Sequence, residues 1–312
     1  MRILVTGAAG HMGRLLVAEL LHRFPEHELL ALDRVAAHST HPRLRCWQRD
    51  LRDPDLPVLL AGVDLVIHLA FVVLSPHLGW GKAWRERMAA SNREGTRALL
   101  EAMRTAGVHR LIYSSSVAVY GAWPDNPAII DEQQRLRPNP GFAYAEDKVA
   151  VEGLLDEHAA SDPRLRITRL RLHAIVGPQA QPLVNNIATS PFGLRLPDPD
   201  LPLQCIHEQD AIGAVLAALT QDRPGAYNIA APDPIPWSSI PRRWSLPLSP
   251  RQMHEIHRRL RPLVRAMGDP GWLLGLEHPL VVDCRKAEAE LGWRARHDVA
   301  QAIASVRGES LG

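Results

Sequence analysis

Tyr144 and Lys148 stand four residues apart, a spacing that brings two side chains to one face of a helix. A cation beside a phenol favours the phenolate, so we expect a lowered tyrosine pKa. Tyr144 would then give and take a proton at a carbonyl or alcohol. Any helix can hold this spacing, so the pair alone is weak evidence. The lysine content strengthens it, because only three of the 36 basic residues are lysines: Lys82, Lys148 and Lys286.

The N-terminal segment has the pattern of a dinucleotide-binding turn. Residues 2–6 form a short apolar, β-branched run typical of a buried strand, and residues 14–23 have helical periodicity. Between them, Gly7 permits a tight turn, Gly10 lets the backbone approach a pyrophosphate, and Gly13 lets helix and strand pack closely. The alternative is a glycine-rich turn with no ligand.

An acidic residue stands where such a turn predicts one. Residues 28–33 indicate a second strand, which ends at Asp33, twenty residues after Gly13. A carboxylate there accepts hydrogen bonds from the adenosine ribose and repels a 2′-phosphate. We therefore expect NAD, although Arg34 leaves NADP open.

Composition agrees with a reduced, globular protein. The chain has 312 residues, which allow one large or two small domains, and 46% of them are hydrophobic. A net charge of +2 and the even spread of Arg argue against nucleic acid as a partner. The cysteines lie far apart, so we expect free thiols in the cytoplasm and no metal site from their spacing. We also expect no signal peptide and no membrane span. The cysteines are Cys46, Cys205 and Cys284.

Strand and helix patterns alternate along the first half of the chain. Alternation of this kind predicts a parallel, doubly wound sheet with its ligand beyond the carboxyl ends of the strands. Gly7, Asp33, Ala70 and residues 114–116 all follow such strand ends. After residue 173 the pattern becomes irregular and rich in proline. Besides residues 2–6 and 28–33, strands are expected at 43–48, 64–70, 109–114, 166–172 and 227–230, and helices at 14–23, 84–106, 142–160, 210–219 and 251–266.

These segments together resemble the extended short-chain dehydrogenases/reductases of the NAD-dependent epimerase/dehydratase family. The resemblance covers nearly the whole chain and implies a Rossmann domain over 1–173 and a small substrate lobe over 174–312, with 204–230 returning to the Rossmann domain. The motifs that carry it, in family order, are residues 6–13, Asp33, 50–51, 68–70, 92–96, 114–121, 144–148, 171–178, Asp210, 227–230 and 291–293.

The resemblance also implies roles for single residues. Ser116 would hold the substrate oxygen beside Tyr144, although a strand-end serine can also serve only in hydrogen bonding. His68, at a buried strand end, is expected to be structural. The catalytic set is then Ser116, Tyr144 and Lys148. The cofactor-binding set is Gly7, Gly10, His11, Met12, Gly13, Asp33, Asp50, Leu51, Leu69, Ala70, Asn92, Tyr144, Lys148 and His173.

The chain departs from the nucleotide-sugar epimerases of this family in its substrate region. Those enzymes have an asparagine where Ala174 stands, and only 31 residues, 179–209, separate Gly177-Pro178 from Asp210. We therefore expect a smaller or more apolar carbonyl or alcohol substrate, contacted by Val72, Val73 and residues 179–200. A nucleotide-sugar epimerase or dehydratase remains an alternative. A cofactor-sensing protein without turnover is another, against which the Tyr144–Lys148 pair argues.

Family resemblance further implies a homodimer that pairs the helices at 84–106 and 142–160. The alternative is that their apolar side chains only pack on the sheet. The side chains expected at the interface are Leu99, Leu100, Met103, Val149, Leu154 and Leu155.

Overall fold

The computed structural model describes most of the chain, including nearly all of the first 180 residues. The described residues are 1–37, 39–73, 82–180, 185, 189–190, 192–196, 198, 200–240, 243–260 and 269–307, without the side chains of 82 and 192–195.

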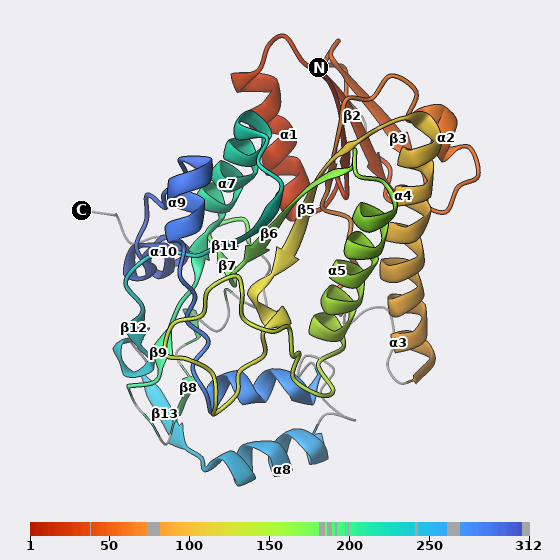
Figure 1. Ribbon diagram of the computed structural model, residues 1–312. Coiled ribbons are helices and arrows are strands. Elements are labelled where there is room, and N and C mark those ends of the chain that lie inside the picture. The colour runs from red at the N-terminus through yellow and green to blue at the C-terminus, as the bar shows by residue number, and fades with distance from the viewer. Residues whose placement is uncertain are drawn as a thin grey trace.

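A seven-stranded sheet in which every pair is parallel forms the centre of the molecule (Figure 1). Six strands follow the order 3-2-1-4-5-6 of a Rossmann fold, so the predicted doubly wound sheet is confirmed. The seventh, at the edge beside β6, comes from residues 225–229. Across the sheet the strands are β11 (Gly225–Ile229), β6 (Arg166–Leu172), β5 (Arg110–Ser116), β4 (Leu65–His68), β1 (Arg2–Thr6), β2 (Glu28–Asp33) and β3 (Leu44–Gln48).

Helices cover both faces of the sheet. Because side chains alternate along a strand, Ile3 and Val5 face one helical layer and Leu4 faces the other. The two layers pack into two separate buried cores, which hold the sheet rigid between them. The first layer holds α1 (His11–Arg23), α7 (Glu208–Gln221) and α9 (Arg285–Leu291), and the second α2 (Leu56–Leu59), α4 (Gly95–Ala106) and α5 (Ala143–Ser161).

The helix expected over 84–106 contains a change of winding. It begins as α3 (Lys82–Ala89), passes through a π-helical segment, η1 (Ala90–Glu94), and continues as α4. A π segment inside a helix is often found at a functional site. Here it carries Asn92, which is buried.

The apolar side chains of α4 and α5 belong to the core of a single chain. Leu99, Leu100, Met103 and Leu155 are at most 2% exposed and pack on the sheet. These four side chains therefore cannot offer a dimer surface, because burial against β4, β5 and β6 already covers them, whereas Val149 is half-buried and Leu154 is 7% exposed.

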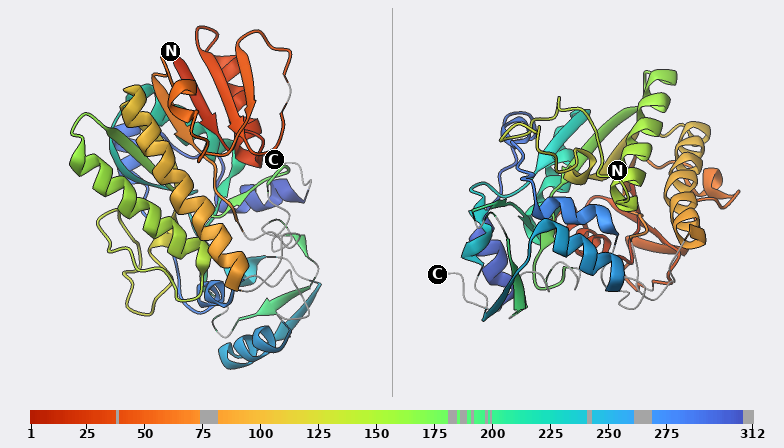
Figure 2. Two further views of the ribbon diagram at one scale, coloured as in Figure 1. Left: turned by 90° about the vertical axis from the view of Figure 1, so that its right-hand side faces the viewer. Right: turned by 90° about the horizontal axis from the view of Figure 1, so that it is seen from below.

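The C-terminal part is built from short elements beyond one end of the sheet (Figure 2). The helix expected over 251–266 begins at Pro250 and is described to Leu260, whereas 261–268 lie outside the described residues. Across the described ranges, no helix is both long and apolar enough to cross a membrane. The remaining elements are η2 (Val117–Val119), β7 (Ile175–Val176), β8 (Phe192–Arg195), β9 (Pro202–Leu203), β10 (Ile206–His207), β12 (Ile235–Pro236), η3 (Trp237–Ser239), β13 (Trp244–Pro247), α8 (Pro250–Leu260), η5 (Pro270–Leu276) and α10 (Val299–Val306).

Candidate active site

A pocket of about 280 Å³ lies at the carboxyl ends of the central strands, where the topology predicts a ligand. It gathers segments that are far apart in the sequence, from the first turn to the π-helical segment. Eight of the expected cofactor-binding residues line it: Gly7, Gly10, Asp33, Asp50, Leu51, Leu69, Ala70 and Asn92.

The glycine-rich turn has the close packing that its sequence predicts. Gly7 has φ +71°, and a Cβ there would lie 2.6 Å from the Ala70 nitrogen. A Cβ on Gly13 would lie 2.2 Å from the Gly7 carbonyl oxygen. Neither position accepts a side chain, so the turn stays tight against β4 and α1.

The turn also fits the pyrophosphate of a dinucleotide. Helix α1 begins after Gly10 without a side-chain cap, so its first N–H groups are available to an anion. Asp33 accepts the N–H of Ala9 at 2.9 Å and of Val35 at 3.0 Å, which fixes its carboxylate at the pocket wall.

His68 is structural, as expected. Its Nδ1 lies 2.7 Å from the Thr6 hydroxyl and its Nε2 lies 3.0 Å from the Thr96 hydroxyl. Burial, with a smaller effect from Lys148, lowers the pKa of His68 to about 3, so the ring is neutral. The three side chains tie β1, β4 and α4 together behind the pocket.

Asn92 shapes the pocket through the main chain of Val72. Its amide accepts the Val72 N–H at 2.7 Å and donates to the Val72 carbonyl at 3.1 Å. It also donates to Asp147 on α5 at 3.1 Å, and Asp147 pairs with Arg93. Asn92 thus holds the segment after β4 next to the helix that carries Tyr144.

Ser116, Tyr144 and Lys148 meet beside this pocket. Phe71, which lines the pocket, lies 3.7 Å from the Lys148 nitrogen and contacts the Tyr144 ring edge-on at 5.4 Å. Lys148 donates to the Ser114 carbonyl at 2.5 Å, and Ser116 hydrogen bonds with Tyr144. The three expected catalytic side chains therefore lie together.

The electrostatics of the pair differ from the simple expectation. Burial raises the pKa of Tyr144, and its hydrogen bond with Ser116 opposes that rise only in part. The predicted fall in the tyrosine pKa is wrong for the protein without ligand. Burial also lowers the pKa of Lys148 to about 7, against the charges of Glu152 and Asp147. Burial thus disfavours the charge of Lys148, which weakens its effect on the phenol.

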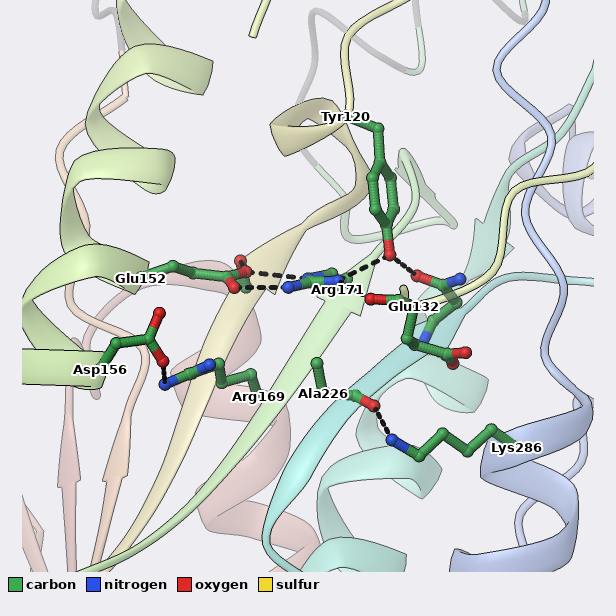
Figure 3. A network of polar contacts seen from close by, with 10 residues as sticks. Tyr120, Glu132, Glu152, Asp156, Arg169, Arg171, Ala226 and Lys286 are labelled. Atoms are coloured by element: carbon green, nitrogen blue, oxygen red, sulfur yellow. Dashed lines mark hydrogen bonds and ion pairs between the residues drawn. The ribbon is translucent and has the colours of Figure 1, made fainter. Parts of the chain in front are cut away.

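A buried ionic network supports the strand that carries Ser116 (Figure 3). Glu152 on α5 accepts a hydrogen bond from Ser115 at 2.6 Å. It also pairs with Arg171, which donates from Nη2 at 2.7 Å and from Nε at 3.0 Å. Arg171 also donates to the Tyr120 hydroxyl, which donates to Asn228. Strands β5, β6 and β11 are thereby linked to α5.

The other expected cofactor-binding residues lie away from the pocket lining. Met12 packs on the core, and Gly13 serves the packing described above. His11 Nε2 lies 3.2 Å from the buried carboxylate of Glu208. His173 has both ring nitrogens on main-chain groups, those of Leu280 and Ala174, and burial lowers its pKa to about 4.

Sequence reasoning missed Phe71 and the Glu152–Arg171 pair. Phe71 follows Ala70 at a strand end, so its place along the chain was a usable signal. Glu152 stands one helical turn after Lys148, but its partner on β6 is visible only in the folded chain.

The sequence matches a known protein family. The model of the family described as "NAD dependent epimerase/dehydratase family" matches residues 3–230. The chain belongs to that family. Its identification as an extended short-chain dehydrogenase/reductase with a Rossmann fold is thus confirmed, as is NAD as the cofactor that the family uses.

The individual relatives are only distantly similar to this chain in sequence. An uncharacterized protein of Mycobacterium tuberculosis is 28% identical over 236 residues, which are 73% of this chain but only 62% of that relative. A 3-beta-hydroxysteroid dehydrogenase of Mycolicibacterium neoaurum is 33% identical over 48% of this chain and 41% of its own. The structure of MoeE5 in complex with UDP-glucuronic acid and NAD has a TM-score of 0.74 over the full length of both chains at 24% identity, which shows the common fold.

Proposed function

We propose that this chain is an NAD-dependent oxidoreductase that acts on a carbonyl/alcohol pair through Ser116, Tyr144 and Lys148. The observation that supports it is the position of Phe71, one ring that lines the dinucleotide pocket and contacts Tyr144 and Lys148 together. Substrate and cofactor would therefore meet at these side chains.

Each residue of this set has a separate task in the proposal. NAD supplies or accepts the hydride when bound. Tyr144 gives its proton to the carbonyl oxygen during reduction and takes it back during oxidation. Ser116 holds that oxygen next to the phenol. Lys148 binds the ribose hydroxyls of the nicotinamide and, when charged, favours the phenolate.

Cofactor binding would use the pocket lining and the turn. Asp33 accepts hydrogen bonds from the adenosine ribose, and Asp50 with Leu51 holds the adenine. The remaining proposed contacts lie along the turn, β4, η1 and β6: Gly7, Gly10, His11, Met12, Gly13, Leu69, Ala70, Asn92 and His173. Residues 1–173 would form the cofactor domain and 174–312 the substrate lobe, with 204–230 returning to the first.

An apolar substrate fits the surroundings of Tyr144. Phe71 lies on one side of its ring, and Phe142 lies 5.7 Å away. Ala174, which is exposed, stands where the family's nucleotide-sugar enzymes have an amide. The partial match to a hydroxysteroid dehydrogenase supports the same class. We propose Val72, Val73 and residues 179–200 as further contacts, of which 181–184, 186–188, 191, 197 and 199 lie outside the described residues.

A cofactor-reduction screen tests this proposal. The panel holds hydroxysteroids, flavonoid-like alcohols, small aldehydes and ketones, and UDP-sugars, each with the wild type and with Tyr144→Phe. Turnover of an apolar alcohol or ketone that the variant loses is the expected result. NAD binding without turnover on any class would favour a cofactor-sensing protein.

Nucleotide-sugar epimerisation is the second candidate, because the family's description includes epimerases and the same proton carrier serves both reactions. Saturable low-micromolar binding of UDP-glucose with epimer formation would establish it and overturn the apolar substrate.

A cytoplasmic homodimer belongs to the proposal as well. Its contact surface on α4 and α5 would not include the buried Leu99, Leu100, Met103 and Leu155, and light scattering at micromolar concentration tests the assembly.

A further inference from the structure

Two histidines and an aspartate come together on the face of the sheet that α7 covers. His207 ends β10, Asp210 lies in the first turn of α7, and His297 lies on the segment between α9 and α10. Their ligand atoms all lie within 4.8 Å of one another. His207 is 6% exposed, Asp210 3%, and the side chain of His297 22%. Such residues are the common ligands of a first-row transition metal.

The hydrogen bonds around this cluster show which nitrogens carry lone pairs. His297 places its main-chain N–H 3.0 Å and its Nδ1 2.8 Å from the same Asp210 oxygen, Oδ2. A ring nitrogen facing a carboxylate carries the proton, so an ion bound between His297 and Asp210 would take the place of the Nδ1 proton, and Nε2 would carry the ring proton instead. His207 accepts the N–H of Gln209 on Nδ1 at 3.2 Å, so that atom is already unprotonated.

A metal ion would therefore find two donors in the required state, His207 Nδ1 and the Asp210 carboxylate, and would release the proton of the third, His297 Nδ1. The lone pair of His207 would exchange one helix-cap hydrogen bond for a metal bond. The imidazole rings of His207 and His297 already lie close together, with centroids 4.1 Å apart and planes tilted by 32°.

Access to the cluster is open on one side. Asp210 and His297 both line a pocket of about 470 Å³ between α1, α7 and the segment before α10. This pocket is separate from the one at the carboxyl ends of the strands. It gives an ion a route in and leaves room for water in the remaining coordination positions.

We propose that His207, Asp210 and His297 bind a divalent transition metal ion, with Zn²⁺ as the first candidate. Ligands about 2.1 Å from a tetrahedral ion are roughly 3.4 Å apart, so on binding the 2.8 Å between His297 Nδ1 and Asp210 Oδ2 widens by about half an ångström, while the ligand atoms that are farther apart, up to 4.8 Å, move closer together. His297 lies on a connecting segment, which can make that movement. The ion ties the C-terminal segment to α7.

This site is invisible in the sequence because its parts do not form a compact motif. His207 and Asp210 are three residues apart, and His297 follows 87 residues after Asp210. Only the packing of α9 on α7 and of α10 on β10 brings the third side chain in.

The test uses tag-free protein freed of metal by chelation. Calorimetry with Zn²⁺ and visible absorption with Co²⁺ are measured on the wild type, His297→Ala, Asp210→Asn and a control, His254→Ala. The control removes a histidine that pairs with a carboxylate, Glu277, at 2.7 Å but belongs to no group of three possible metal ligands among the described residues. Circular dichroism and NAD titration verify that every variant is folded.

We expect one Zn²⁺ per chain and Co²⁺ absorption bands in the wild type and in His254→Ala. Both cluster variants should lose the bands and bind Zn²⁺ at least roughly 10–100-fold more weakly. Asp210→Asn is decisive, because an amide oxygen still accepts the His297 N–H while the charge is lost. Zn²⁺ should raise the melting temperature of the wild type and not that of His297→Ala. Equal binding by the wild type and both variants, or no stoichiometric binding by the wild type, would overturn the proposal. The cluster would then serve only as a set of hydrogen bonds between α7 and the segment of His297.

Discussion

The Lys148 nitrogen lies 3.7 Å from the centroid of the Phe71 ring, in a cation–π contact at the wall of the dinucleotide pocket. Phe71 also meets Tyr144 edge-on at 5.4 Å. One apolar ring thus removes water from the amine and borders the phenol. This position explains why burial is the largest influence on both pKa values.

Tyr144→Phe tests the proton carrier. The change removes the hydroxyl but keeps the ring that packs on Phe71 and Phe142, so the fold and the cofactor pocket stay intact. Turnover should fall by ~10²–10⁴ with NAD affinity nearly unchanged. Steady-state kinetics on a substrate from the screen, with NAD titration by fluorescence, measures both.

Tyr227→Phe is the matched control. Tyr227 is buried and hydrogen bonds to Glu290 at 2.7 Å, far from the proposed site. Its variant should keep wild-type turnover. Normal turnover by Tyr144→Phe would remove Tyr144 from the mechanism.

Lys148 gives a prediction for stability against pH. Its folded pKa of about 7 lies below the ordinary value of 10.5, so below pH 7 the folded protein holds a buried charge. The unfolded chain binds more protons between pH 7 and 10.5, and the destabilisation is relieved as pH rises through that window. Lys148→Met removes the charge.

The variant without cofactor should therefore be more stable than the wild type near pH 6, by on the order of a few kcal/mol. That advantage should shrink as pH rises toward 10.5. Urea unfolding at a series of pH values measures it. A stability difference that does not change with pH would mean that Lys148 is not desolvated.

Much of the fold was predictable because it depends on local patterns. The apolar runs of β1, β4 and β6 and the spacing of the glycines gave the sheet and its turn to within a few residues. The π-helical segment was not predictable from the periodicity of 84–106, and the hydrogen bond of its Asn92 with Val72 joins positions 20 residues apart. The Glu152–Arg171 pair and the cluster around Asp210 were not predictable for the same reason, since both join elements that only the tertiary fold brings together.

Asp33 should determine the choice between NAD and NADP. Its carboxylate lines the pocket next to Arg34, so a 2′-phosphate would meet a negative charge. Wild type should bind NADH more tightly than NADPH. In Asp33→Asn the preference for NADH over NADPH should fall by roughly tenfold, which corresponds to about 1.4 kcal/mol of binding free energy.

Fluorescence titration with both cofactors measures this preference. The matched control is Asp64→Asn, because Asp64 also accepts a main-chain N–H, from Arg2 at 2.7 Å, but is exposed at the opposite end of the sheet. It should leave both affinities unchanged. Tighter binding of NADPH by the wild type would contradict the assignment of Asp33.

The Tyr113 hydroxyl is buried without a hydrogen-bond partner among the described residues. Burial raises its pKa well above the usual value, so it is a neutral phenol. Tyr113→Phe removes a polar group that has lost its contact with water, and should be neutral or stabilise the fold by about 1 kcal/mol. Thermal and urea unfolding measure it, and a loss of more than about 1 kcal/mol would reveal a partner for the hydroxyl.

Glu152 and Arg171 form the buried ion pair on which the strand of Ser116 depends. Their side chains are 1% and 6% exposed. Glu152→Gln leaves the Arg171 charge without its partner, and should cost about 3–5 kcal/mol of unfolding free energy. Replacing both residues, as in Glu152→Leu with Arg171→Met, removes both charges together and should cost less than Glu152→Gln alone.

Asp156 and Arg169 provide the comparison on the same two elements (Figure 3). Asp156 is 67% exposed, so Asp156→Asn should cost no more than about 1 kcal/mol. Urea unfolding of all four proteins gives the free energies. If Glu152→Gln lowered the free energy of unfolding as little as Asp156→Asn does, water would have to reach Arg171. The network would then be a surface feature that does not stabilise the position of β5. A large cost for Glu152→Gln, with recovery in the double variant, would show that the charge pairing itself holds Ser115 and so keeps Ser116 beside Tyr144.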